Sequence, residues 1–277
     1  MKRILLPCGE SVPALGQGTW HVGDDPSRRQ EEIATIQRGI DLGLALVDTA
    51  EMYGDGRSEE LVGAAIAARR HEVFLVSKVY PHHASQRAML RACEASLRRL
   101  RVETIDLYLL HWPGAVPLAE TVSAFEALQR AGKIRHWGVS NFDLEKMRQL
   151  WRVPGGHAAQ TNQVLYNLGE RGIEWDLRLW LRDRGLPVMA YSPFDEGRLL
   201  RQPGLQAFAQ ACGMTAAQVA LAWLMTQAGV IAIPKTGNRK RMDENAAALS
   251  RTLSPPQLEE LRRLFPEPSG AVPLAML

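Results

Sequence analysis

Short apolar segments alternate with longer amphipathic segments along this sequence, and the alternation repeats eight times. The predicted strands are residues 12–19, 45–49, 73–78, 105–111, 134–141, 158–163, 187–192 and 230–235. The predicted helices that follow them are residues 30–42, 58–68, 85–100, 118–131, 144–151, 173–184, 215–227 and 241–249. Strands rich in Val, Ile and Leu that are separated by helices are expected to be parallel and covered by helices. Eight such units predict an α/β fold of the (β/α)8 TIM barrel type.

The length and the two ends of the chain fit this fold. Single α/β barrels often reach the length of this chain, 277 residues, so we expect residues 1–277 to form one domain. Turn-forming residues from Pro7 to Glu10 predict a short N-terminal hairpin before the first unit. The residues after Leu253 are few and rich in proline, which predicts a short C-terminal tail.

An open doubly wound sheet is the alternative fold for alternating strands and helices. Dinucleotide-binding sheets of that kind carry the fingerprint G-x-G-x-x-G after the first strand. Here Gly16 and Gly18 occupy the first two positions, but His21 stands at the third. The incomplete fingerprint favours the barrel.

Charge and composition argue against several classes of function. The formal net charge is +3 and the basic residues are scattered, so we expect no nucleic-acid partner. No segment approaches the roughly 18 apolar residues of a membrane span, and the N-terminal apolar run breaks at Pro7, so we expect neither a membrane segment nor a signal peptide. Cys8, Cys93 and Cys212 lie far apart, which is typical of reduced thiols and predicts a cytoplasmic protein.

Nearly every predicted strand ends on a polar or ionisable residue. Asp48, Lys78 and His111 end the second, third and fourth strands. The later strands end at Ser140 and Asn141, at Asn162 and Gln163, at Tyr191 and Ser192, and at Lys235. In a barrel these ends meet at one rim, where barrel enzymes have their active sites. Strands also become polar simply because they leave the core, but that does not account for this selection of Asp, Lys, His and Tyr.

The chemistry of these side chains predicts carbonyl reduction if they meet. Tyr53 follows the second strand, and its phenol is a proton donor with an ordinary pKa of roughly 10. We expect the Lys78 ammonium to lower that pKa and Asp48 to keep Lys78 charged. His111 is expected to donate a hydrogen bond to a carbonyl oxygen. Together they form a proton donor facing an oxygen that becomes negative.

This constellation closely resembles the aldo-keto reductase superfamily. The resemblance extends over almost the whole chain, through LGQGTW, VDTAEMYG, VSK, LLHWP, GVSNF, TNQVLYN, AYSP and IPKTGNRKRMDEN. It is greatest for small bacterial members that reduce methylglyoxal and other 2-oxoaldehydes. The resemblance implies a catalytic tetrad of Asp48, Tyr53, Lys78 and His111. It also implies reduction of small aldehydes and ketones, including aromatic aldehydes and keto esters, with Tyr53 as the proton donor.

The resemblance further implies NADPH as the cofactor, bound across the rim. The implied cofactor-binding residues are Ser140, Asn141, Gln163, Tyr191, Ser192, Phe194, Lys235, Thr236, Arg241, Glu244 and Asn245. Among them, Tyr191 would stack on the nicotinamide, and Lys235 and Arg241 would hold the 2′-phosphate. A phosphate dianion is well matched by Arg, Lys and a helix N-terminus. Trp20, Trp112 and His111 are the predicted substrate contacts.

Some residues depart from the family pattern or suggest other chemistry. Asp195 and Glu196 follow the seventh strand and would repel a pyrophosphate unless they point away or pair with Arg198. The short loop after His111 and the short tail predict an open, shallow site. No metal is expected, because the adjacent His82 and His83 lack further ligands.

Two other functions stay open. Some barrels of this family act mainly as cofactor-binding regulatory subunits with slow reductase activity, although an intact tetrad favours an enzyme. A barrel enzyme acting on sugar phosphates is more distant, because it would not need Asp48, Tyr53 and Lys78 together. We expect a monomer that acts on a small carbonyl substrate.

Overall fold

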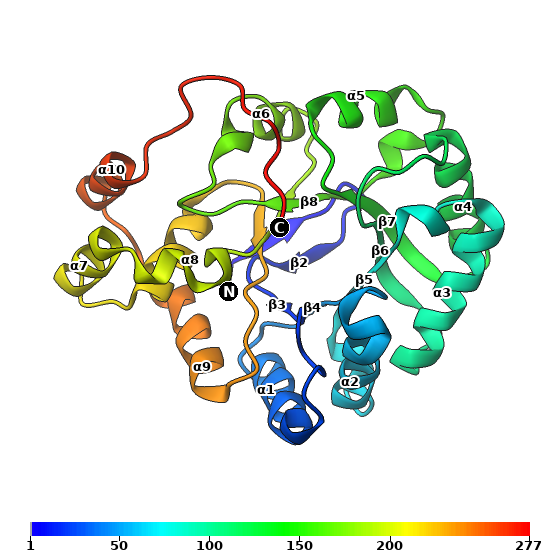
Figure 1. The fold of residues 1–277 in the computed structure, drawn as a ribbon, viewed down its shortest axis with the longest axis horizontal. Helices are drawn as coiled ribbons and strands as arrows, with labels where there is room; N and C mark the ends of the chain where they lie inside the picture. The colour runs from blue at the N-terminus through cyan, green and yellow to red at the C-terminus, as the bar shows by residue number, and fades with distance from the viewer. Residues whose placement is uncertain (1) are drawn as a thin grey trace.

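Eight parallel strands form a closed ring surrounded by helices in the computed structural model, which describes residues 2–277 (Figure 1). The strands are β3 (Gln17–Gly18), β4 (Leu46–Asp48), β5 (Phe74–Val79), β6 (Ile105–Leu110), β7 (Ile134–Ser140), β8 (Asn162–Leu165), β9 (Val188–Tyr191) and β10 (Val230–Ala232). They lie in chain order, each hydrogen-bonded to the next. Parallel bridges from Leu15 to Ala232 and from Gly18 to Lys235 join the first strand to the last. The predicted (β/α)8 barrel is therefore confirmed.

The described residues contain ten α-helices. They are α1 (Arg29–Asp41), α2 (Arg57–Ile66), α3 (Gln86–Leu100), α4 (Leu118–Arg130), α5 (Leu144–Arg152), α6 (Leu177–Arg182), α7 (Pro203–Ala211), α8 (Ala216–Thr226), α9 (Arg239–Ala247) and α10 (Pro255–Leu264). All eight predicted helices are present, and only α6 is much shorter than expected. Its predicted first turn is a separate 3-10 turn, Gly172–Glu174, and Asp176 then caps the helix proper.

Helices α7 and α10 were not predicted. Each begins with proline, at Pro203 and at Pro255. Elsewhere in a helix proline indicates a break in the helix, so these segments did not look helical. The first helical position tolerates proline because its missing N–H would have no partner there. In α10, Ser254 and Gln257 also form a capping box. The segment expected as a plain tail therefore begins with a helix.

Two strand predictions need correction. Residues 12–19 are divided between the hairpin strand β2 (Ser11–Pro13) and β3 of the barrel, because Pro13 and Gly16 interrupt a single run. The sixth predicted strand, residues 158–163, instead starts at Asn162 and continues to Leu165, so Asn162 begins β8. Gln163 still lies at the rim, since it pairs with Ser140 at the end of β7.

The N-terminal hairpin closes one end of the barrel. Strand β1 (Arg3–Leu5) pairs antiparallel with β2, as predicted, and Ile4 lies opposite Val12. These two side chains are buried in the same cluster as Leu46, Leu107 and other residues that fill the barrel interior. Burying such side chains is worth about 1.5–3 kcal/mol each, so the hairpin is a packed part of the core. The opposite, carboxyl end is free to carry polar side chains.

Among residues 2–277, no single helix has both the length and the apolar character needed to cross a membrane. Helices α7 and α8 reach that length and hydrophobicity only as a pair, and they are bent by 84° at the break between them.

Candidate active site

Four ionisable side chains meet at the carboxyl end of the barrel. Asp48 ends β4, Lys78 lies next to the end of β5, and His111 directly follows β6. Lys78 Nζ donates hydrogen bonds to Asp48 Oδ2 at 2.7 Å and to the Tyr53 hydroxyl oxygen at 3.0 Å. The His111 ring faces Tyr53 with 5.8 Å between the ring centroids. The four residues predicted to be catalytic therefore lie together.

A tight turn presents Tyr53 to this group. The next three residues all have left-handed backbone conformations, with φ of 58° at Gly54, 54° at Asp55 and 90° at Gly56. Glycine adopts this conformation without a steric penalty, and aspartate is among the few other residues that tolerate it. Helix α2 begins immediately afterwards, at Arg57. The Gly-Asp-Gly sequence thus reverses the chain directly after the phenol.

Lys78 and Asp48 form a buried ion pair, with side chains only 0% and 2% exposed. Both oxygens of Asp48 accept hydrogen bonds, since Gln163 Nε2 donates to Oδ1 at 2.8 Å. Accepting at both oxygens is the pattern of an ionised carboxylate. Burial acts to lower the pKa of Lys78, but its interactions with Asp48 and Tyr53 outweigh burial and raise that pKa above its ordinary value. The lysine therefore stays charged next to the phenol.

The phenol of Tyr53 remains protonated. Burial raises the pKa of Tyr53 above its ordinary value, whereas the charge of Lys78 acts to lower it and that of Asp48 to raise it. Lys78 therefore acts on the phenol in the expected direction, but burial outweighs the ammonium and the pKa of Tyr53 stays above its ordinary value. Since Lys78 donates to the phenol oxygen, the phenol's own hydrogen is left to point toward a ligand.

His111 is neutral at physiological pH. Burial, together with the nearby Lys78 charge, lowers the pKa of His111 to about 2. Its Nδ1 is buried and has no hydrogen-bond partner within residues 2–277. A neutral imidazole has one N–H, so His111 can donate a single hydrogen bond without adding charge.

A chain of hydrogen bonds connects the tetrad with four of the predicted cofactor-binding residues. The Tyr191 hydroxyl donates to Asn141 Oδ1 at 3.0 Å, and Asn141 Nδ2 donates to Ser140 Oγ at 3.3 Å. Ser140 Oγ in turn donates to the backbone oxygen of Gln163 at 2.8 Å, and Gln163 contacts Asp48. The residues predicted at this end of the site are therefore contiguous and share one network.

The predicted phosphate-binding stretch lies at the N-terminus of α9. Its first turn is made of Arg239, Lys240 and Arg241 and contains no acidic residue. Asn238 Oδ1 caps it by accepting from the Arg241 backbone N–H at 3.2 Å, and Thr236 Oγ1 accepts from the Asn238 N–H at 3.1 Å. A basic first turn at a positive helix end is a favourable anion site. The sequence therefore fits the phosphate end of NADPH.

One basic residue near this stretch was missed by the sequence analysis. Arg28 Nη2 donates to the backbone oxygen of Gly237 at 3.0 Å. Arg28 and Arg241 both help to lower the pKa of Lys235, whose own burial is the main cause. Arg28 lies about two hundred residues away in sequence, so no local motif connects it with Gly237. Glu244 and Asn245, which are also predicted to bind the cofactor, lie in the next turn of α9, and Asn245 is largely buried.

Asp195 and Glu196 do not stand as free carboxylates. Arg198 donates to both oxygens of Asp195, at 2.7 and 3.0 Å, and lies 4.0 Å from a Glu196 oxygen. Both acidic residues have positive φ, as does Ser192, so the chain is tightly coiled after β9. Phe194, which precedes Asp195, packs against the core. Asp195 and Glu196 therefore pair with Arg198, which is one of the two arrangements in which they would not repel a pyrophosphate.

Of the aromatic residues predicted to contact substrate, Trp112 lies beside the tetrad. Trp112 packs against His111 with 4.9 Å between the ring centroids, and both Trp112 and Trp20 are partly exposed. The C-terminal tail leaves the carboxyl end of the barrel less open than expected. It crosses over the barrel (Figure 1), and the Leu277 backbone N–H donates to the Tyr191 hydroxyl at 3.4 Å. After α10 ends at Leu264, the tail forms no further helix or strand, and its last residue lies beside Tyr191.

An eight-stranded barrel with an Asp, Tyr, Lys and His cluster at its carboxyl rim defines a class of barrel oxidoreductases, and comparison with known proteins identifies the family. The profile of the Aldo/keto reductase family matches residues 14–265. The chain is a member of this family.

Similar proteins cover the full length of the chain. The chain is 50% identical to methylglyoxal reductase YeaE of Escherichia coli K12, over 100% of this chain and 99% of the relative. It is 33% identical to glyoxal reductase of Bacillus subtilis, over 94% of this chain and 92% of the relative. A crystal structure of an aldo/keto reductase from Klebsiella pneumoniae in complex with NADP and acetate shares 49% identity and a TM-score of 0.97, over 100% and 99% of the two chains.

Proposed function

We propose that this protein reduces small aldehydes and ketones with NADPH, and that 2-oxoaldehydes such as methylglyoxal are its preferred substrates. The observation that carries the proposal is the Tyr53 phenol, which receives a hydrogen bond from Lys78 and keeps its own proton. The likeness to a methylglyoxal reductase and a glyoxal reductase supports the substrate class.

The side chains of the tetrad have separate tasks in this reaction. A carbonyl oxygen placed between Tyr53 and His111 accepts hydrogen bonds from the phenol and from the neutral imidazole. Reduced nicotinamide, when bound, supplies the hydride that adds to the carbonyl carbon. Tyr53 then transfers its proton to the oxygen, which completes the alcohol and leaves a phenolate. The Lys78 ammonium, 3.0 Å from that oxygen, stabilises the phenolate until solvent returns the proton.

The residues that would hold NADPH extend from the rim to α9. Tyr191 offers its ring at the nicotinamide end, beside the amide of Asn141. At the other end, Lys235 and Arg241, with Arg28 added by the structure, carry the positive charge that a 2′-phosphate needs. Phe194 and Ser192 lie between the two ends. This charge distribution supports NADPH over NADH.

Partly exposed aromatic rings around the tetrad support a small substrate. Trp20 and Trp112 provide flat apolar walls, and the C-terminal tail narrows the mouth above Tyr191. We further propose that residues 1–277 act as one domain, because the hairpin packs into the same barrel that carries the tetrad. We also propose that this domain is a cytoplasmic monomer.

Loss of NADPH absorbance tests the proposal directly. Methylglyoxal, 4-nitrobenzaldehyde and a β-keto ester are supplied in turn to the wild type and to Tyr53→Phe. We expect the highest kcat/KM with methylglyoxal. Tyr53→Phe should lose about 10²–10⁴-fold in kcat because only the proton donor is removed. Its NADPH dissociation constant, measured by fluorescence quenching, should stay within about threefold of wild type because no phosphate contact changes.

Two results would overturn the proposal. Full activity of Tyr53→Phe would remove the phenol from the mechanism. Tight NADPH binding by the wild type without turnover of any of the three carbonyls would favour the regulatory, cofactor-binding alternative. Tyr80→Phe is the matched control, since Tyr80 lies near Trp112 but outside the tetrad, and it should keep most of its activity.

A further inference from the structure

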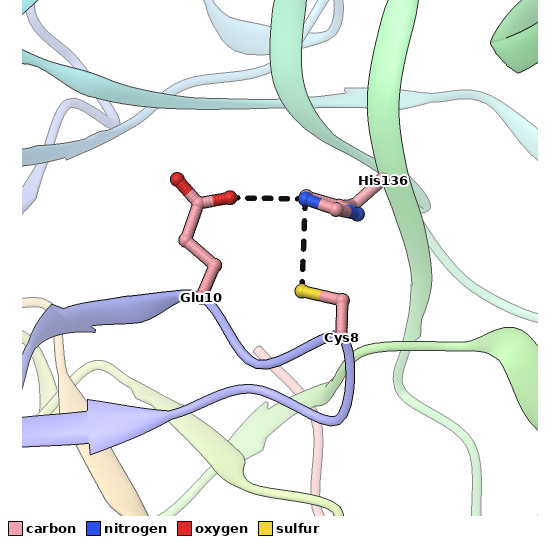
Figure 2. A group of neighbouring side chains, drawn as sticks. All are labelled: Cys8, Glu10 and His136. Atoms are coloured by element: carbon pink, nitrogen blue, oxygen red, sulfur yellow. Dashed lines mark hydrogen bonds and ion pairs between the residues drawn. The ribbon is translucent and has the colours of Figure 1, made fainter.

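Three potential metal ligands meet at the hairpin end of the barrel, opposite the tetrad. Cys8 and Glu10 lie in the turn between β1 and β2, and His136 lies near the start of β7. His136 Nε2 is 3.0 Å from Glu10 Oε2 and 3.6 Å from Cys8 Sγ. All three ligand atoms lie within 4.8 Å of one another. Figure 2 shows the three side chains directed at a common point.

The turn that carries Cys8 and Glu10 is fixed in place. Gly9 between them has φ +87°, a conformation that glycine adopts freely. The Leu6 backbone N–H donates to the backbone carbonyl oxygen of Glu10 at 2.8 Å. The Cys8 backbone N–H donates to Gln160 Oε1 at 2.8 Å, and Gln160 is itself 6% exposed. The hairpin turn is therefore held against β7 and the segment that precedes β8, with both side chains facing His136.

The geometry argues against a nucleophilic triad. In such a triad the histidine contacts the thiol through one ring nitrogen and the carboxylate through the other. Here Cys8 and Glu10 both contact the same nitrogen, Nε2 (Figure 2). A single N–H cannot serve both partners well. A cation between the three atoms would be bound by all of them at once.

We infer that Cys8, Glu10 and His136 bind a divalent cation of the zinc type. Thiolate, imidazole and carboxylate are the ligands that Zn²⁺ uses in proteins, at about 2.0–2.3 Å. In a tetrahedral site such bonds place ligand atoms roughly 3.3–3.7 Å apart. The sulfur-to-nitrogen distance of 3.6 Å already lies in this range, and the 3.0 Å between oxygen and nitrogen needs only a small rotation of Glu10. The fourth position is open to water.

The neighbouring Arg135 is compatible with a bound cation. Its guanidinium contacts Glu10 Oε2 at 2.8 Å, but it also donates to Asp106 Oδ1 at 2.9 Å. Asp106 is 5% exposed and keeps Arg135 in place if Glu10 turns toward the ion. A bound ion would connect the hairpin to β7 and stabilise the closed end of the barrel. The site departs from the expectation of no metal, which considered only His82 and His83.

Cobalt provides a direct spectroscopic test on the full chain with reduced thiols. A Co²⁺ ion bound to a thiolate absorbs through a sulfur-to-metal charge-transfer band. We expect this band to saturate at one Co²⁺ per chain and to be displaced by Zn²⁺. The band should be absent in Cys8→Ser. Affinity for Co²⁺ should fall at least about tenfold in His136→Asn and in Glu10→Gln.

Matched variants separate this site from other thiols and histidines. Cys212→Ser and His71→Asn change the same residue types elsewhere and should keep the band and its affinity. Zn²⁺ should raise the melting temperature of the wild type but not of Cys8→Ser, because binding to the native state stabilises it. Carbonyl reduction should be equal in wild type and Cys8→Ser. A wild type that shows no band, or a band that persists in Cys8→Ser, would overturn the inference.

Discussion

The two ends of strand β7 lie in contrasting environments. At the carboxyl end, Ser140 is fully buried in a hydrogen-bond network that leads to Asp48 and Lys78. Near the opposite end, the His136 side chain is 19% exposed and contacts side chains of the hairpin turn. At the carboxyl end, the charges of Asp48 and Lys78 survive burial only because each has a fixed partner. At the hairpin end, solvent is close enough to compensate for a lost contact, so a change should cost far less stability.

The largest expected effect is on stability after loss of Lys78. Lys78→Met leaves the Asp48 charge buried without its cation, so the free energy of unfolding should fall by about 3–5 kcal/mol. Urea denaturation followed by circular dichroism measures this. Arg135→Met is the matched change at the hairpin end, where the guanidinium is 48% exposed. It should cost about 1 kcal/mol or less, because Arg70 still donates to the buried Asp106 carboxylate.

Equal losses in the two variants would break the comparison between the ends. If Lys78→Met alone does not fold, the double variant Asp48→Asn with Lys78→Met tests the same point. Removing both charges should recover much of the stability, because no uncompensated charge remains.

The next largest effect concerns the cofactor. Arg241→Ala should raise the NADPH dissociation constant about 10- to 100-fold, the range for a hydrogen bond to a charged group, and should hardly change that for NADH. Arg28→Ala should also raise the NADPH dissociation constant and hardly change that for NADH, but the increase should be smaller. Fluorescence titration with both cofactors measures each constant. Arg182→Ala removes the same charge from an exposed site, 63% accessible, and should leave both constants unchanged.

A parallel rise of the NADPH and NADH constants in Arg241→Ala would contradict a 2′-phosphate contact. A similar rise in Arg182→Ala would mean that net charge, rather than the first turn of α9, decides the preference.

The smallest expected effect is a pH dependence of stability from His111. Its pKa is about 2 in the folded protein, whereas an unfolded histidine has a pKa near 6.5. Below about pH 6.5 the unfolded chain binds a proton that the folded chain does not, so stability falls as the pH falls. The contribution is at most about 1.4 kcal/mol per pH unit.

Comparing wild type with His111→Gln between pH 7 and pH 5 isolates this contribution. Over that interval the free energy of unfolding should fall less steeply with pH in the variant than in the wild type. The two slopes should differ by at most about 1.4 kcal/mol per pH unit, the value for one proton. His157→Gln, which changes an exposed histidine, is the control and should follow the wild type. Identical slopes in wild type and His111→Gln would show that His111 does not stay neutral when folded.

Local patterns predicted the barrel and the cluster of four ionisable side chains at its carboxyl rim. The barrel followed from eight apolar segments separated by amphipathic ones, and the tetrad followed from the residues that end or follow those segments. Such positions are set by topology, because the carboxyl ends of parallel strands must meet at one rim. The pairing of Asp195 with Arg198 was also within reach, since the two are three residues apart.

Contacts between distant segments were not predictable in this way. Arg28 reaches Gly237, and the end of the tail reaches Tyr191, through the closure of the barrel. The sequence suggested the effect of Lys78 on the pKa of Tyr53 but not the larger effect of burial, because burial depends on everything packed around the phenol.

The sequence by itself determined the fold class and the kinds of side chain at the catalytic rim, because hydrophobic periodicity and strand ends are local properties. Only the tertiary structure decided which of those side chains form hydrogen bonds with one another and how deeply they are buried. It also decided that Cys8 and Glu10 lie beside His136. Burial and proximity between distant segments arise when the ring closes and the hairpin packs into it. No local pattern of residues carries that information.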